Sequence, residues 1–103
     1  MNSHGKGSDR SALLYKALLT LKTPEECYAF FEDLCTIPEI RSIAQRLEVA
    51  VLLRRGETYQ RIAEQTGASS ATISRVNRSL SYGADGYDRV LSRMAEQANQ
   101  KET

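Results

Sequence analysis

Small hydroxyl side chains and arginines are concentrated over residues 69–78, in the sequence SSATISRVNR. An arginine can donate two hydrogen bonds to a guanine edge, and a serine or threonine can bond to a phosphate or a base. The small side chains between them would let a helix approach the floor of a DNA major groove. The residues that we assign to such a surface are Ser69, Ser70, Ala71, Thr72, Ser74, Arg75 and Arg78.

The surrounding residues have the spacing of a helix-turn-helix, which we place at 59–80. Ile62, Ile73 and Val76 are spaced to form a small core shared by two helices. Ala63 leaves room for the helices to cross closely, and Gly67 can take the positive φ that a tight turn requires. A hairpin that serves packing alone is the alternative, although it would not require so many small and apolar residues at fixed offsets.

Hydroxyl residues also stand where these two helices should begin. Thr58 precedes the first helix, and Ser69 and Ser70 precede the second. Such side chains accept hydrogen bonds from the free backbone N–H groups of a first helical turn. The sequence therefore specifies where both helices start.

Positive charge is concentrated around this motif, although the chain has 14 basic and 13 acidic residues and a net charge of only +1. Residues 41–78 contain seven arginines against three acids, whereas acids outnumber bases on either side. This distribution is expected of a surface that binds phosphate. We expect Arg54, Arg55 and Arg61 to contact the DNA backbone, or else to be ordinary charged surface residues. Gln60 is also assigned to the DNA-binding surface.

The remaining sequence predicts helices and no strand with convincing alternation, so the fold class is all-α. Thr23-Pro24 and Thr36-Ile37-Pro38, each followed by a glutamate, are helix start signals. Four of the six expected helices cover about 11–22, 24–34, 37–55 and 86–98, and the other two form the helix-turn-helix at 59–80.

A chain of 103 residues is expected to form one domain, here over residues 11–98. Residues 1–10 are expected to be a flexible arm, and residues 99–103 a frayed end. The first helix carries more apolar side chains than a peripheral helix of one small domain needs. We therefore expect a homodimer, in which a second copy covers this surface.

Other classes of protein are disfavoured. No apolar run is long enough to span a membrane, and no secretory signal is evident, so a cytoplasmic protein without a membrane partner is expected. Cys27 and Cys35 have no histidine neighbours, which predicts neither a metal site nor a disulfide framework. No nucleophile has a partner base, so we expect no catalytic residues, no cofactor and no enzyme activity.

Residues 36–80 resemble the tryptophan-repressor-like (TrpR-like) family, and specifically its YerC/YecD-type members. The resemblance rests on Thr36, Glu39 and Arg46, and on the segments LRRGETYQRIAEQTGA and SATISRVNRSL. It implies a six-helix fold, an interlocked homodimer and binding of operator DNA by the two helix-turn-helix motifs.

The same resemblance implies a site for a small-molecule corepressor. In the tryptophan repressor the indole lies between two arginines, near a threonine and a serine, and the matching positions here are Thr36, Arg46, Arg75 and Ser79. From the residues alone, Arg46 could equally be a solvent-exposed residue at the edge of the helix's apolar face, or it could form an ion pair with an acidic residue. A glycine follows the second arginine in that repressor, whereas this chain has Val76, and the chain is one residue shorter before the turn. We therefore expect DNA binding and dimerisation, and do not expect tryptophan to be an effector.

A second function remains open. A helical module could keep the geometry of the hairpin and use it to bind a protein. A salt-dependent complex with duplex DNA would separate the two hypotheses.

Overall fold

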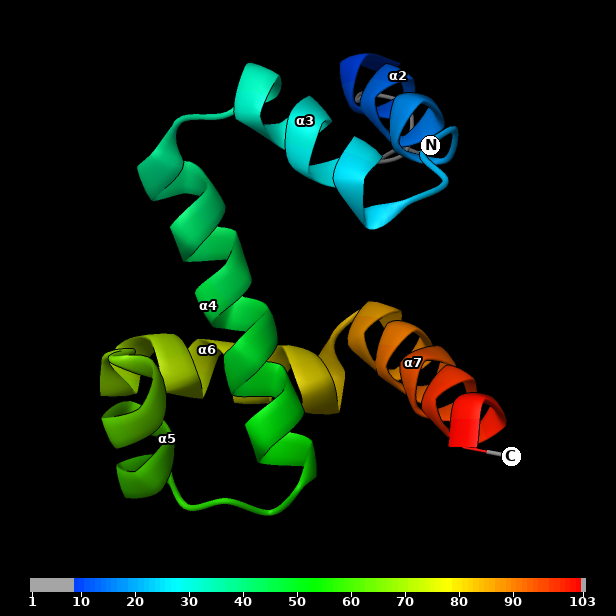
Figure 1. Ribbon diagram of the computed structural model, residues 1–103. Helices are drawn as coiled ribbons and strands as arrows, with labels where there is room; N and C mark the ends of the chain where they lie inside the picture. The colour runs from blue at the N-terminus through cyan, green and yellow to red at the C-terminus, as the bar shows by residue number, and fades with distance from the viewer. Residues whose placement is uncertain (1–8, 103) are drawn as a thin grey trace. The chain divides into compact units, whose positions relative to one another are not determined.

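The computed structural model describes residues 9–102, and these residues form six α-helices and no strand (Figure 1). The helices are α2 (Asp9–Leu18), α3 (Pro24–Leu34), α4 (Ile37–Arg54), α5 (Tyr59–Thr66), α6 (Ser70–Tyr82) and α7 (Gly86–Glu102). The predicted all-α class and the number of helices are confirmed. No helix in this part of the chain is both long and apolar enough to cross a membrane.

The first and last helices differ from their predicted ranges. The expected helix over 11–22 begins at Asp9 and ends at Leu18. It ends early because Thr20 and Leu21 donate their N–H groups to carbonyls three residues back, those of Ala17 and Leu18, at 3.1 Å each. This spacing tightens the chain out of the α-helical pattern.

The helix expected over 86–98 continues to Glu102, so the predicted frayed end at 99–103 is wrong as far as Glu102. Residues 95–102 contain no glycine or proline and are mostly strong helix formers, so nothing in this segment stops the helix. At the other end of the chain, Asp9 and Arg10 are helical, which shortens the arm predicted for residues 1–10. Residues 1–8 and Thr103 lie outside the described residues.

The predicted N-caps are present at three helix starts. The hydroxyl of Thr23 accepts from the backbone N–H of Glu26 at 3.1 Å, and Thr58 accepts from Arg61 at 3.2 Å. Ser69 accepts from Thr72 at 3.1 Å. Each bond satisfies one N–H that the helix itself leaves free. Capping therefore fixes the starts of α3, α5 and α6 locally.

The described chain divides into two compact units, one ending at Ile37 and one beginning at Pro38. The first unit contains α2 and α3, and α3 has no buried residue. Its large apolar side chains are mostly in solvent, including Leu13 (71% exposed), Leu19 (86%) and Tyr28 (73%). This unit does not bury its own apolar surface. The expectation of one domain over residues 11–98 stays a prediction.

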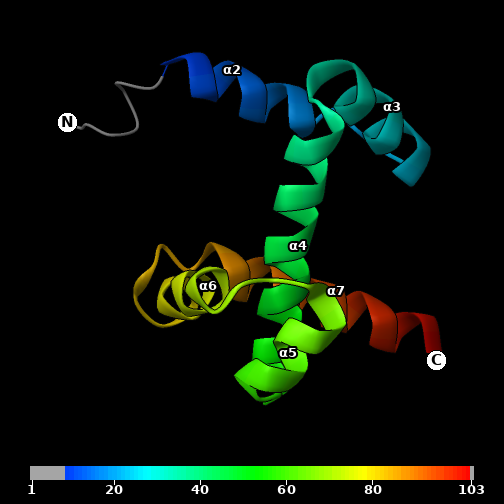
Figure 2. The same cartoon turned by 90° about the vertical axis from the view of Figure 1, so that its left-hand side faces the viewer.

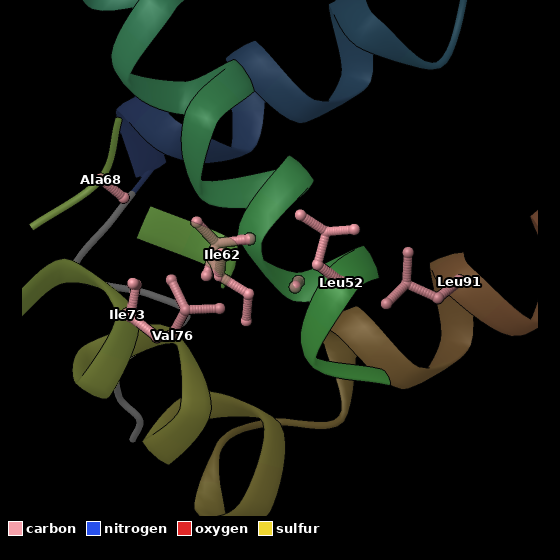
Figure 3. Packing of buried hydrophobic residues seen from close by; sticks show 8 residues of the cluster. Leu52, Ile62, Ala68, Ile73, Val76 and Leu91 are labelled. Atoms are coloured by element: carbon pink, nitrogen blue, oxygen red, sulfur yellow. The ribbon is translucent and has the colours of Figure 1, made fainter. Parts of the chain in front are cut away.

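The second unit contains the hydrophobic core. Figure 2 shows α5, α6 and α7 beside the second half of α4. The buried side chains of the core, drawn in Figure 3, come from all four helices and the turn between α5 and α6. They are Val49, Ala50, Leu52, Ile62, Ala68, Ile73, Val76 and Leu91. The predicted core of Ile62, Ile73 and Val76 is therefore confirmed, and it packs on α4.

Truncation of Ile62 tests this core. Its side chain is fully buried, so we expect Ile62→Ala to lower the free energy of unfolding by about 2–5 kcal/mol through lost burial and a residual cavity. Urea denaturation followed by circular dichroism measures the change. Gln65→Ala, at an exposed position of the same helix, is the control and should stay within about 0.5 kcal/mol. Equal effects of the two substitutions would contradict the assigned core.

Candidate nucleic-acid interface

The turn between α5 and α6 holds the two helices of the motif at a fixed angle. Gly67 has φ 75° and ψ 6°, and its N–H bonds to the carbonyl of Ala63 at 2.9 Å. A side chain at this φ would be strained, which confirms the predicted role of the glycine. The positive φ ends α5 and redirects the chain toward the start of α6.

Two polar side chains that sequence reasoning missed also hold the turn. The Thr66 hydroxyl donates to the Ile62 carbonyl at 2.7 Å and accepts from the Ala68 N–H at 3.1 Å. Gln45 Nε2 donates to the Thr66 carbonyl at 3.1 Å, which ties the turn to α4. A threonine just before a turn glycine is a weak local signal for the first contact. Gln45 is 21 residues away from its partner, and no local pattern predicts that bond.

At the start of α6, two of the predicted DNA-contacting hydroxyls bond to each other. Ser69 Oγ donates to Thr72 Oγ1 at 3.1 Å and also accepts from the Thr72 N–H as the cap. Thr72 is half-buried, whereas Ser70 and Ala71 are exposed. The first turn of α6 is therefore rigid and lacks bulk on its outer surface.

The rest of the outer surface of α6 has the predicted character. Ser74, Arg75 and Arg78 are exposed, while Ile73 and Val76 on the same helix are buried against the core (Figure 3). Serines and arginines at helical spacing thus face solvent because the apolar residues between them anchor the opposite side. The structure brings the proposed DNA-contacting residues of α6 to one exposed surface.

The predicted DNA-contacting residues outside α6 are less uniform. Arg55 and Gln60 are exposed. Arg61 Nε lies 3.3 Å from Oε1 of Glu57, four residues back in the loop before α5, and Arg54 Nη1 lies 2.8 Å from Asp88 Oδ1 on α7. Two of the expected phosphate contacts are therefore already in ion pairs. These pairs are partly exposed, so each contributes little stability and can be exchanged for another anion.

A hollow of about 370 Å³ lies between α4, α6 and α7. Its lining includes Arg46, Arg75 and Ser79, three of the four residues that the resemblance places around a corepressor. Thr36, the fourth, belongs to the unit that ends at Ile37. The other lining residues are Ile43, Leu47, Val76 and Tyr87. The volume is near the low end of the range of about 300–1,000 Å³ that is usual for small-molecule sites.

The hollow combines charge with an apolar floor. Arg46 is half-buried and Arg75 is exposed, so two guanidinium groups line one cavity. Val76 is 2% exposed and serves mainly as core, as the sequence indicated. Tyr87, from the first turn of α7, was not predicted as a site residue because the sequence marks it only as part of an apolar stripe. This arrangement could hold a small anion with an apolar part.

Comparison with known proteins agrees with this architecture. The model of the family described as Trp repressor protein matches residues 10–95. The uncharacterized protein YerC of Bacillus subtilis (strain 168) is 60% identical over 83 residues, which cover 81% of this chain and 80% of YerC.

Two solved structures are also similar. One is a TrpR-like protein from Eubacterium eligens ATCC 27750, with 57% identity and a TM-score of 0.84 over 89% of this chain and 96% of that chain. The other is a candidate Trp repressor from Staphylococcus aureus, with 49% identity and a TM-score of 0.83 over 91% and 96% of the two chains. The chain therefore belongs to the Trp repressor family, as a TrpR-like member of the YerC type.

Proposed function

We propose that the protein is a transcriptional regulator, of repressor type, that binds operator DNA as a homodimer through α5 and α6. The observation that carries the proposal is the outer surface of α6, where small hydroxyl side chains and two arginines are exposed over a buried apolar side. Membership of a family of regulators supports the same function. A cytoplasmic location follows from this proposal, and the function requires no catalytic group and no cofactor.

The chemistry divides the exposed residues into two groups. Arg75 and Arg78 have the guanidinium geometry to bond to O6 and N7 of guanine in the major groove. Ser70 and the free N–H groups at the start of α6 suit a phosphate, because the positive end of the helix dipole lies there. Arg61 and Arg55 lie outside α6 and suit the DNA backbone, which carries affinity without sequence choice.

Selection of bound sites from random duplexes tests the proposal directly. A DNA regulator should enrich a site with two related halves and should bind it more weakly as salt increases. The protein-interaction module that the hairpin could alternatively form would enrich no sequence. Failure to bind any duplex at low salt would reject the proposed function.

Arg75 should contribute to sequence choice. We expect Arg75→Ala to weaken binding to the selected site by roughly 1–3 kcal/mol and to relax preference at one base pair in each half-site. Titration of the site and of its single-base variants measures both effects. Arg61→Ala is the control for a phosphate contact, because it should weaken all sequences alike and flatten the salt slope by about one unit. If Arg75→Ala changed neither the affinity for the selected site nor the base preference, α6 would not be the recognition helix.

The proposed homodimer explains the apolar surface of the chain. Besides the side chains of α2 and α3, Val90 and Met94 on α7 are each 47% exposed, and Leu47 is 37% exposed. A monomer rarely leaves so much large apolar surface in contact with water. Obligate homodimer interfaces commonly bury more than about 2,000 Å² in total, enough to cover such residues.

Light scattering at micromolar concentration should therefore give the mass of a dimer. Leu13→Asp should weaken the dimer, because it places a charge among the apolar side chains of α2. Ala12→Asp adds the same charge at an exposed position about 100° around that helix from Leu13, so it is the control for charge alone and should lower the mass less. A folded monomer in the wild-type sample would contradict the homodimer.

The hollow at Arg46 and Arg75 is proposed not to accept L-tryptophan as an effector. Val76 adds three carbon atoms over glycine at the floor, and it has little freedom to move because it is part of the core with Ile62 and Ile73. Overfilling a packed site costs about 1–3 kcal/mol. Calorimetric titration with millimolar L-tryptophan should therefore show weak or no binding, and DNA affinity should be the same with and without it.

Substitution of Val76 separates steric exclusion from the absence of a pocket. Val76→Gly should open space for an indole, although it also loosens the core and places glycine within α6. Val76→Ala is a milder companion that keeps the helix propensity high. Saturable binding to the wild-type protein that tightens DNA affinity would contradict the steric argument. If the Val76 variants are folded and still do not bind tryptophan, the residues that line the hollow form no tryptophan site.

A further inference from the structure

An ion pair joins the end of α4 to the start of α7. Arg54 Nη1 donates to Asp88 Oδ1 at 2.8 Å, across 34 residues of sequence. Arg54 lies in the last turn of its helix and Asp88 in the first turn of its own. Each charge therefore also interacts favourably with the dipole of the helix that carries it. The pair of Arg61 and Glu57 joins residues only four apart in the sequence, whereas this pair links two helices.

The position of Arg54 makes its pairing relevant to DNA binding. Arg54 and Arg55 are the last basic residues before the loop that leads to Thr58 and α5, in the most basic part of the chain. The guanidinium group binds a carboxylate and a phosphate through the same donors. While Asp88 occupies those donors, its charge also repels a nearby phosphate.

The exposure of the ion pair allows another anion to replace the carboxylate, and it limits what the pair adds to folding stability. The Arg54 side chain is 38% exposed and the Asp88 side chain 56% exposed, so water already competes for both groups. An exposed pair of this kind contributes little to folding, so its loss should leave the fold intact.

We propose that Asp88 is an internal competitor for DNA phosphate, which occupies Arg54 in the free protein and lowers its affinity for duplexes of any sequence. Docking on DNA exchanges the carboxylate for a phosphate oxygen at Arg54. Asp88 thus lowers the affinity for DNA through its bond to Arg54 and does not contact DNA itself. The inference rests on the proposed DNA-binding function.

The test measures duplex affinity against salt concentration for the full chain. Asp88→Asn should tighten binding of a non-operator duplex roughly threefold and steepen the logarithmic salt slope by up to about 0.9, the value of one phosphate contact on B-form DNA. Asp88→Ser, which also suits a first helical turn, should act in the same way. Circular dichroism should show unchanged helix content in both variants.

Two controls isolate Arg54 from the general effect of removing an acid. Asp85→Asn removes the same charge three residues earlier, at a φ of 67° that asparagine readily adopts, and should change affinity less than about twofold with no change of slope. In an Arg54→Ala background, Asp88→Asn should no longer tighten binding, because the group that it releases is absent.

The outcomes distinguish this inference from the proposed function. Wild-type binding that neither Asp88 variant changes would overturn the competition while leaving DNA binding intact. Equal tightening by Asp85→Asn, or the same gain with and without Arg54, would also overturn it, because charge alone would explain the effect. Binding by Asp88→Asn where the wild type binds weakly or not at all would support it. No duplex binding by either protein would overturn both proposals.

Discussion

The contact of Ile62, Ile73 and Val76 with the second half of α4 is the interaction on which the rest of the second unit depends. α5 has only eight residues, and a helix that short is not stable alone in water. Its order must come from burial, and Ile62 and Ile73 are both 0% exposed. The same burial fixes which side of α6 faces solvent. Loss of this core would therefore remove the exposed surface of α6 as well as the stability of the motif.

The parts of the structure that the sequence predicted well are those determined by neighbouring residues. The caps at Thr58 and Ser69 and the left-handed turn at Gly67 each depend on bonds within four residues, and all three are present. The shared core was predictable because helical periodicity places its members on one side of each helix. The last helix continues past the predicted end at Ala98 to Glu102, because the polar residues Gln100, Lys101 and Glu102 are also good helix formers.

The features that the sequence did not reveal depend on residues far apart in the chain. The bond from Gln45 to the Thr66 carbonyl spans 21 residues, and the pair of Arg54 with Asp88 spans 34. Neither position has a local signal, because a glutamine or an aspartate on a helix surface is ordinary in composition. Tyr87 has the helical spacing of an ordinary apolar residue with Leu91 and Met94, yet it lines the hollow beside Arg46. Such contacts require the three-dimensional packing of α4 and α7.

The arginines of this chain meet two demands that oppose each other. A surface that binds DNA needs unpaired positive charge, whereas a folded chain of nearly neutral net charge offers many carboxylates to each cation. The exposed arginines of α6 avoid this conflict, because their helix carries no acidic residue over 70–82. Arg54 and Arg61 lie outside that helix, and both have a carboxylate partner. Ion pairs are thus found among the arginines proposed to adjust affinity, where Arg55 alone is unpaired in the described chain, and not among the α6 arginines proposed to read sequence.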